Sequence, residues 1–188
     1  MSINFRLNIL NKKAASPANK PNEIIKSLGI CEGNIIGDIG AGGGYFTFRF
    51  SEEVGANGKV YAADTDSRFL NFIEEKAVEQ KIKNVKTVIA DENRLDLPEK
   101  VDMLFLRNVF HHLHEPEEYF KNIKKLLSED GVIALIDYKK ENSSFTCESG
   151  HYTPENIMID EIEKAGFYVF KKFDFLPEQS FMLFKIIK

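Results

Sequence analysis

Asp38, Gly40, Gly42 and Gly44 alternate with other residues in the pattern D-x-G-x-G-x-G. Glycine has no Cβ, so it permits tight turns and lets the backbone approach a ligand closely. Backbone N–H groups at the start of a helix attract anions such as carboxylates and phosphates. The pattern favours a loop that binds a dinucleotide, a nucleotide phosphate or another adenosine-containing ligand. A merely tight glycine turn is the alternative.

Two well-known phosphate-binding patterns do not fit this loop. The dinucleotide pattern G-x-G-x-x-G requires a third glycine, but Tyr45 occupies that position when the pattern starts at Gly40. Thr47 occupies it when the pattern starts at Gly42. The P-loop pattern requires a lysine after a glycine, and this loop has none. The sequence thus disfavours both a standard dinucleotide site and a P-loop.

Two further acids follow the next two apolar runs of the chain. Asp64 follows the last loop glycine by about 20 residues, where a carboxylate commonly accepts hydrogen bonds from ribose hydroxyls. Dehydrogenases use the same device, so Asp64 alone does not identify the ligand. Asp91 ends the following run, with Glu92 as an alternative, and a role as a plain surface-loop acid stays open for it.

The ordered loop and acids resemble the motifs of the class I S-adenosylmethionine-dependent methyltransferases. The segment LFLRNVFHHLHEPEEYF is similar to the family's segment after its fourth strand. The segment GHYTPENIMIDEIEKAGF resembles the closing helix and strand of the small-molecule and quinone-methyltransferase branch of that family. The resemblance implies S-adenosylmethionine as the cofactor and S-adenosylhomocysteine as its product. It implies as cofactor-binding residues Asp38, Gly40, Gly42, Gly44, Tyr45, Asp64, Thr65, Asp91, Glu92 and Asn108. A dehydrogenase is a distant alternative.

Methyl transfer from a sulfonium mainly requires alignment, a dry pocket and sometimes a base, so no catalytic triad is needed. The candidate catalytic residues on the acceptor side are His111, Asp137 and His151. His111 or its neighbour His112 is expected to act as a base or hydrogen-bond donor, with loop packing as the alternative. Adjacent histidines point in different directions and no cysteine lies near them, so we expect no metal site.

These features predict an enzyme that transfers a methyl group in line from S-adenosylmethionine to a small-molecule acceptor. The sequence lacks the Pro-Cys and [DN]-P-P-[YF] motifs of nucleic-acid methyltransferases, and its net charge of −4 gives no general attraction to phosphate backbones. A nucleic-acid partner is therefore not expected. The alternatives are a non-catalytic regulatory protein that binds S-adenosylmethionine and a protein or RNA methyltransferase.

The elements that must position these residues follow from short apolar runs. Near-continuous runs at 34–39, 59–64, 85–90, 101–106 and 131–137 predict parallel strands buried on both faces. Helical patterns cover 21–28, 66–80 and 116–128, the last ended by Gly131, and another helix runs from Thr153-Pro154 to Gly166. Asp66 is expected to cap the helix over 66–80. Residues 167–173 and 180–187 predict an antiparallel hairpin.

Alternating strands and helices predict an α/β fold with a doubly wound, mostly parallel sheet. The resemblance implies seven strands in a Rossmann-like methyltransferase fold with an antiparallel C-terminal hairpin. In such a sheet, ligands bind outside the carboxyl ends of the strands, where the motifs above fall.

The length of 188 residues predicts one methyltransferase domain over 1–188, with 1–19 as a mobile lead or lid. No apolar run approaches the length of a membrane span, and residues 1–10 show no secretory signal. We therefore expect a cytoplasmic location. The oligomeric state is left open.

Overall fold

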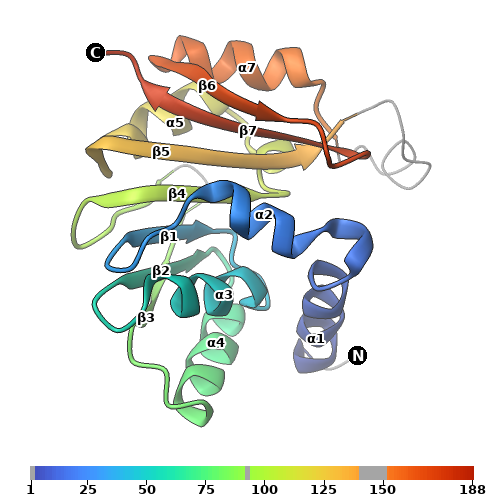
Figure 1. The fold of residues 1–188 in the computed structure, drawn as a ribbon, viewed down its shortest axis with the longest axis vertical. Coiled ribbons are helices and arrows are strands. Elements are labelled where there is room, and N and C mark those ends of the chain that lie inside the picture. The colour runs from blue at the N-terminus through green and yellow to red at the C-terminus, as the bar shows by residue number, and fades with distance from the viewer. Residues whose placement is uncertain (1–2, 92–93, 140–151) are drawn as a thin grey trace. The chain divides into compact units, whose positions relative to one another are not determined.

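The structure, a computed structural model, describes residues 3–91, 94–139 and 152–188 (Figure 1). The chain divides into two compact units, residues 1–91 and residues 92–188. Whether the whole chain behaves as a single domain stays a prediction.

The first unit contains three parallel strands in the order β3-β2-β1. They are β1 (Ile35–Ile39), β2 (Lys59–Asp64) and β3 (Val85–Ile89). The helices are α1 (Ile3–Ala14), the short 3-10 helix η1 (Pro17–Asn19), α2 (Pro21–Leu28), α3 (Tyr45–Val54) and α4 (Ser67–Glu79). Because these strands are parallel, Asp38 near the end of β1 and Asp64 at the end of β2 lie toward the same edge.

Local sequence accounts for where these helices begin. Asp66 caps α4 by accepting a hydrogen bond from the backbone N–H of Arg68 at 2.9 Å, as the sequence predicts. Gly44 precedes α3 with a φ of 80°, a left-handed conformation that favours glycine. The expected helix over 21–28 is also confirmed.

Helix α1 packs on the glycine-rich loop of the same unit. Its Leu7 is fully buried, and the side-chain Nδ2 of Asn11 donates a hydrogen bond to the backbone oxygen of Gly43 at 2.7 Å. The role of residues 1–19 as a mobile lead or lid remains a prediction.

The second unit contains four strands in the order β4-β5-β7-β6. They are β4 (Val101–Arg107), β5 (Leu127–Tyr138), β6 (Phe167–Phe173) and β7 (Gln179–Ile186). The helices are the 3-10 helix η2 (Phe110–His112), α5 (Pro116–Lys124) and α7 (Glu155–Lys164). Strands β4 and β5 are parallel, whereas β7 is antiparallel to both β5 and β6, so the expected C-terminal hairpin is confirmed.

One predicted element is wrong in its boundary. The helix expected over 116–128 ends at Lys124, and Gly131, expected to end that helix, lies inside strand β5. The N–H of Val101 donates to the oxygen of Leu126 at 2.8 Å, and Val101 pairs with Leu127. Leu126 and Leu127 suit the apolar period of a helix as well as that of a strand, and pairing with a distant strand decides between them.

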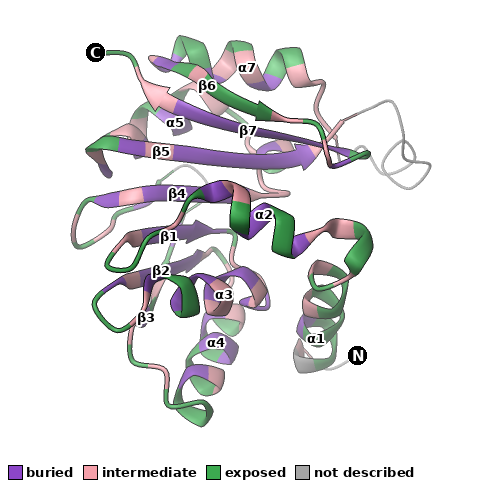
Figure 2. Ribbon diagram, viewed as in Figure 1, coloured by how far each residue is buried: buried purple, intermediate pink, exposed green. Residues whose placement is uncertain are grey.

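The cores of both units follow strands β1, β2, β4, β5 and β7, which are mostly buried, whereas β3 and β6 are largely intermediate or exposed (Figure 2). The burial on both faces that was predicted for 85–90 is therefore wrong, because β3 pairs only with β2 and lies at the edge of the sheet. The strands of the described ranges number seven, and the expected mostly parallel α/β class with its antiparallel hairpin is confirmed. No helix in the described part of the chain is long and apolar enough to cross a membrane.

Candidate active site

The glycine-rich loop after β1 has the conformation that its glycines allow. Gly40, Gly42 and Gly44 have φ values of 71°, 55° and 80°, a region that other residues rarely adopt. Gly44 is buried, and a Cβ there would lie 2.9 Å from Cγ1 of Ile73 in helix α4. These φ values favour glycine at all three positions, and Ile73 leaves no room for a side chain at Gly44. Close approach of the loop to a ligand stays a prediction.

Asp38, which precedes this loop, is held in a buried environment. Its carboxylate accepts a hydrogen bond from Oγ1 of Thr47 at 2.6 Å, and the residue is only 3% exposed. Burial raises the pKa of Asp38 to about 7, and the charge of Asp64 acts in the same direction, while the hydrogen bonds from Thr47 oppose both. The charge of Asp64 thus helps to raise the pKa of Asp38 beside the loop.

Asp64 is tied to the same loop by its side chain. Its Oδ2 accepts from the N–H of Gly42 at 2.9 Å, and its Oδ1 accepts from the N–H of Asp66 at 3.1 Å. Burial raises the pKa of Asp64, and these backbone hydrogen bonds oppose the shift. An ionised carboxylate has about four acceptor sites, so Asp64 can still accept hydrogen bonds from a ribose diol.

The other residues of this unit that are predicted to bind S-adenosylmethionine are more exposed. Thr65 and Asp91 are exposed, and Tyr45 is half-buried at the start of α3. The N–H of Ala90 donates to the backbone oxygen of Asp64 at 3.0 Å, which brings Asp91 next to the end of β2. The acids suit the ammonium and the ribose hydroxyls of S-adenosylmethionine. The loop N–H groups of Gly40, Ala41, Gly42 and Gly44 already donate to other groups of the protein.

The buried carboxyl of Asp38 makes the stability of the fold depend on pH. Its folded-state pKa of about 7 lies above the ordinary value of 3.8, so the folded protein binds more protons than the unfolded chain between these values. This contribution is present at low pH and is lost as the pH rises through the folded pKa. We expect the free energy of unfolding of Asp38→Asn, relative to the original protein, to increase by about 2 kcal/mol from pH 5 to pH 7.

Urea unfolding at the two pH values measures this effect. The matched control is Asp130→Asn, which removes an exposed acid of the same type. Equal shifts for both variants would show that the effect is general and does not come from Asp38.

In the second unit, two predicted catalytic residues are in contact. Nδ1 of His111 lies 2.7 Å from Oδ1 of Asp137, and their side chains are 5% and 0% exposed. Asp137 also accepts from the backbone N–H groups of His111, at 3.3 Å, and of Tyr138, at 2.7 Å. Oδ1 of Asp137 can accept a hydrogen bond from an N–H at Nδ1 of His111, and in that tautomer of the neutral ring Nε2 carries no proton.

Asn108 follows β4 with a φ of 58° and belongs to a polar chain. Its Oδ1 accepts from Nε2 of Gln179 at 2.6 Å, and Oε1 of Gln179 accepts from the guanidinium of Arg107 at 3.3 Å. Contact of Asn108 with S-adenosylmethionine stays a prediction.

Some predicted residues lie outside the described ranges, and two contributing residues were not anticipated. Glu92 and His151 belong to segments that the structure does not describe. Thr47 and Gln179 carry hydrogen bonds of the site but were not singled out from the sequence. Thr47 lies in the first turn of the helix that follows the loop, which is a recognisable signal, whereas Gln179 is 71 residues from Asn108 and has none. No group of three metal-ligating side chains occurs in the described ranges.

Comparison with known proteins indicates the family of the chain. A family model described as "Methyltransferase domain" matches residues 32–173. The crystal structure of an S-adenosylmethionine-dependent methyltransferase from Aquifex aeolicus is 28% identical, with a TM-score of 0.84, and the match covers 94% of this chain and 97% of that one. The doubly wound α/β class expected from the sequence is thereby confirmed.

Two curated relatives carry names of methyltransferases. A ubiquinone/menaquinone biosynthesis C-methyltransferase (UbiE) of Pseudomonas paraeruginosa is 31% identical over 126 residues, which cover 64% of this chain and 48% of that protein. (S)-Coclaurine N-methyltransferase of Thalictrum flavum subsp. glaucum is 26% identical over 156 residues, which cover 82% of this chain and 40% of that protein. The chain thus spans less than half the length of either relative.

Proposed function

Because the chain belongs to the class I S-adenosylmethionine-dependent methyltransferases, we propose that it methylates a small molecule whose accepting atom loses a proton. The small-molecule acceptor goes beyond membership of the family. It is supported by the names of the two relatives, which refer to small-molecule methylation at carbon and at nitrogen. A cytoplasmic location, expected from the sequence, stays a prediction.

On the donor side, the first unit supplies the binding groups. The N–H of Gly43 would bind the methionine carboxylate, because the N–H groups of its loop neighbours already donate within the protein, and Asp38 would face the ammonium. Asp64 would accept the ribose hydroxyls, and Asp91 would accept from the adenine amino group. When bound, S-adenosylmethionine supplies a methyl group on a sulfonium, whose sulfur keeps the electron pair of the broken carbon–sulfur bond.

On the acceptor side, the contact between His111 and Asp137 carries the proposal. Asp137 would hold the proton on Nδ1 of His111, so that Nε2 takes the proton of the acceptor as the accepting atom bonds to the methyl carbon. His111 then returns that proton to solvent. A hydroxyl, a protonated amine or an acidic C–H group can lose a proton in this way, whereas a thioether cannot.

The experiment that tests this function uses S-adenosylmethionine labelled in its methyl group. The protein is incubated with this donor and a cell extract, and products of low mass are separated from polymers. Label in a low-mass product supports the proposal. Label found only in protein or RNA would replace it with a macromolecular methyltransferase, and donor binding without any labelled product would favour a regulatory protein.

A further inference from the structure

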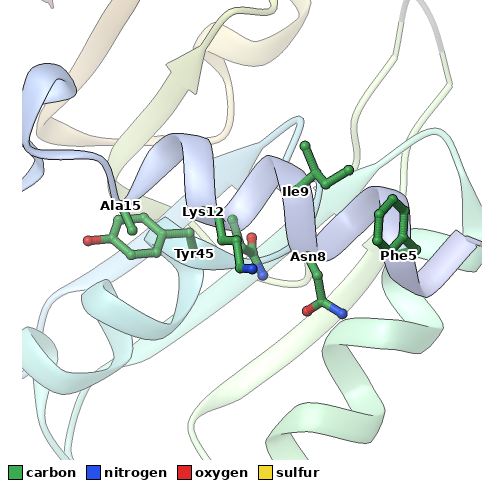
Figure 3. Close-up of a pocket in the computed structure, with 7 residues that line it drawn as sticks. Phe5, Asn8, Ile9, Lys12, Ala15 and Tyr45 are labelled. Atoms are coloured by element: carbon green, nitrogen blue, oxygen red, sulfur yellow. The ribbon is translucent and has the colours of Figure 1, made fainter.

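A hollow of about 490 Å³ lies beside helix α1 in the first unit, apart from the acids that the proposed donor site uses (Figure 3). It is lined by Phe5, Asn8, Ile9, Asn11 and Lys12 of α1, by Ala15 directly after that helix, and by Tyr45 of α3. A volume of this size is typical of pockets for small organic molecules.

Helix α1 has apolar residues on two different faces. Leu7 is fully buried and belongs to the face that packs on the glycine-rich loop. Phe5 and Ile9, one turn apart, line the hollow and are 53% and 45% exposed. The outward face of a surface helix is normally polar, so two large apolar side chains here offer a contact surface for an apolar ligand.

The hollow also carries a positive charge. Lys12 is the one charged side chain among its lining residues, and it lies three positions after Ile9 on the same face of the helix. No ion pair joins Lys12 to a carboxylate in the described part of the chain. An anionic group beside an apolar body would complement this lining.

Two residues connect the hollow to the glycine-rich loop. Asn11 lines the hollow and donates its hydrogen bond to the backbone oxygen of Gly43. Tyr45 lines the hollow and directly follows Gly44, the last glycine of the loop. A ligand in the hollow would therefore lie against the residues that shape the proposed donor site.

We propose that this hollow binds a further ligand, distinct from the proposed methyl donor and acceptor: an apolar small molecule bearing an anionic group such as a carboxylate, sulfonate or phosphate. The proposal goes beyond the function proposed above. Phe5 and Ile9 would contact the apolar body, and Lys12 would pair with the anion.

Fluorescence titration with two probes tests the binding chemistry. Anilinonaphthalene sulfonate is an aromatic anion, and phenylnaphthylamine has the same rings without the charge. We expect Lys12→Met to raise the Kd of the anionic probe by about threefold and to leave that of the neutral probe unchanged. Ile9→Gln should raise both Kd values by about tenfold, because it removes apolar contact area.

Lys13→Met is the matched control, because it removes the neighbouring lysine, which does not line the hollow. Equal effects of Lys12→Met and Lys13→Met on the anionic probe would overturn the proposal, since they would reflect only net charge. Weaker binding of S-adenosylmethionine to Lys12→Met would also overturn it, because Lys12 would then serve the donor.

Discussion

Replacement of His111 by glutamine is expected to lower kcat by about 10²–10⁴-fold, the range typical for loss of a general base. The reason is the pairing of Nδ1 with Asp137 at 2.7 Å, which makes Nε2 the nitrogen that accepts the proton. Binding of S-adenosylmethionine should be unchanged, because His111 has no part in the proposed donor site. Transfer of labelled methyl to the low-mass fraction measures the rate.

His114→Gln is the matched control, since His114 is an exposed histidine three positions away. Its activity should equal that of the original protein. A His111→Gln enzyme with full activity would contradict a role for His111 as a base.

Asp137→Asn tests how the histidine is positioned. An amide can donate to Nδ1 and so move the imidazole proton to Nε2, the nitrogen that must accept a proton. The loss of kcat should therefore approach that of His111→Gln, although Asp137 touches no substrate in this account. Unfolding by urea should show a folded variant, which separates this effect from loss of structure.

Gly44→Ala is expected to destabilise the fold by about 2–5 kcal/mol and to abolish tight donor binding. A left-handed φ of 80° costs an alanine roughly 1–2 kcal/mol. The added Cβ would lie 2.9 Å from Cγ1 of Ile73 and 3.1 Å from Cε2 of Phe48, so overpacking adds about 1–3 kcal/mol. Urea unfolding gives the stability, and calorimetry gives donor binding.

The variant Gly29→Ala separates the cost of a left-handed φ from the cost of overpacking. Gly29 has a φ of 65° but no atom within 4 Å of an added Cβ, so only the conformational cost applies. Its loss of stability should be about 1 kcal/mol, with donor binding unchanged. Equal losses for Gly29→Ala and Gly44→Ala would show that contact with Ile73 contributes nothing.

The fold could be predicted wherever periodicity and local signals agreed. The buried strands β1 and β2 and the Asp66 cap of helix α4 were read correctly, because apolar runs and capping residues act within a few positions. The end of helix α5 was predicted wrongly, because pairing of Leu127 with Val101 is a long-range effect. Such predictions fail for short apolar segments that suit the period of a helix as well as that of a strand.

The candidate site, too, could be predicted only in part. The loop glycines and Asp64 were found from spacing alone, and the structure joins them through the hydrogen bond from Gly42 to Asp64. His111 and Asp137 were both selected, but their contact joins residues 26 positions apart, and no spacing rule indicates it. The pKa of Asp38 depends on burial by the whole unit, which the sequence does not display.

Titration calorimetry with S-adenosylmethionine and S-adenosylhomocysteine tests the central claim most directly. Both should bind with a Kd well below about 1 mM, and Asp64→Asn should weaken both, because Asp64 is proposed to accept the ribose hydroxyls. Lack of binding of either ligand to the original protein at about 1 mM would contradict the donor site, and with it the account of methyl transfer built on it.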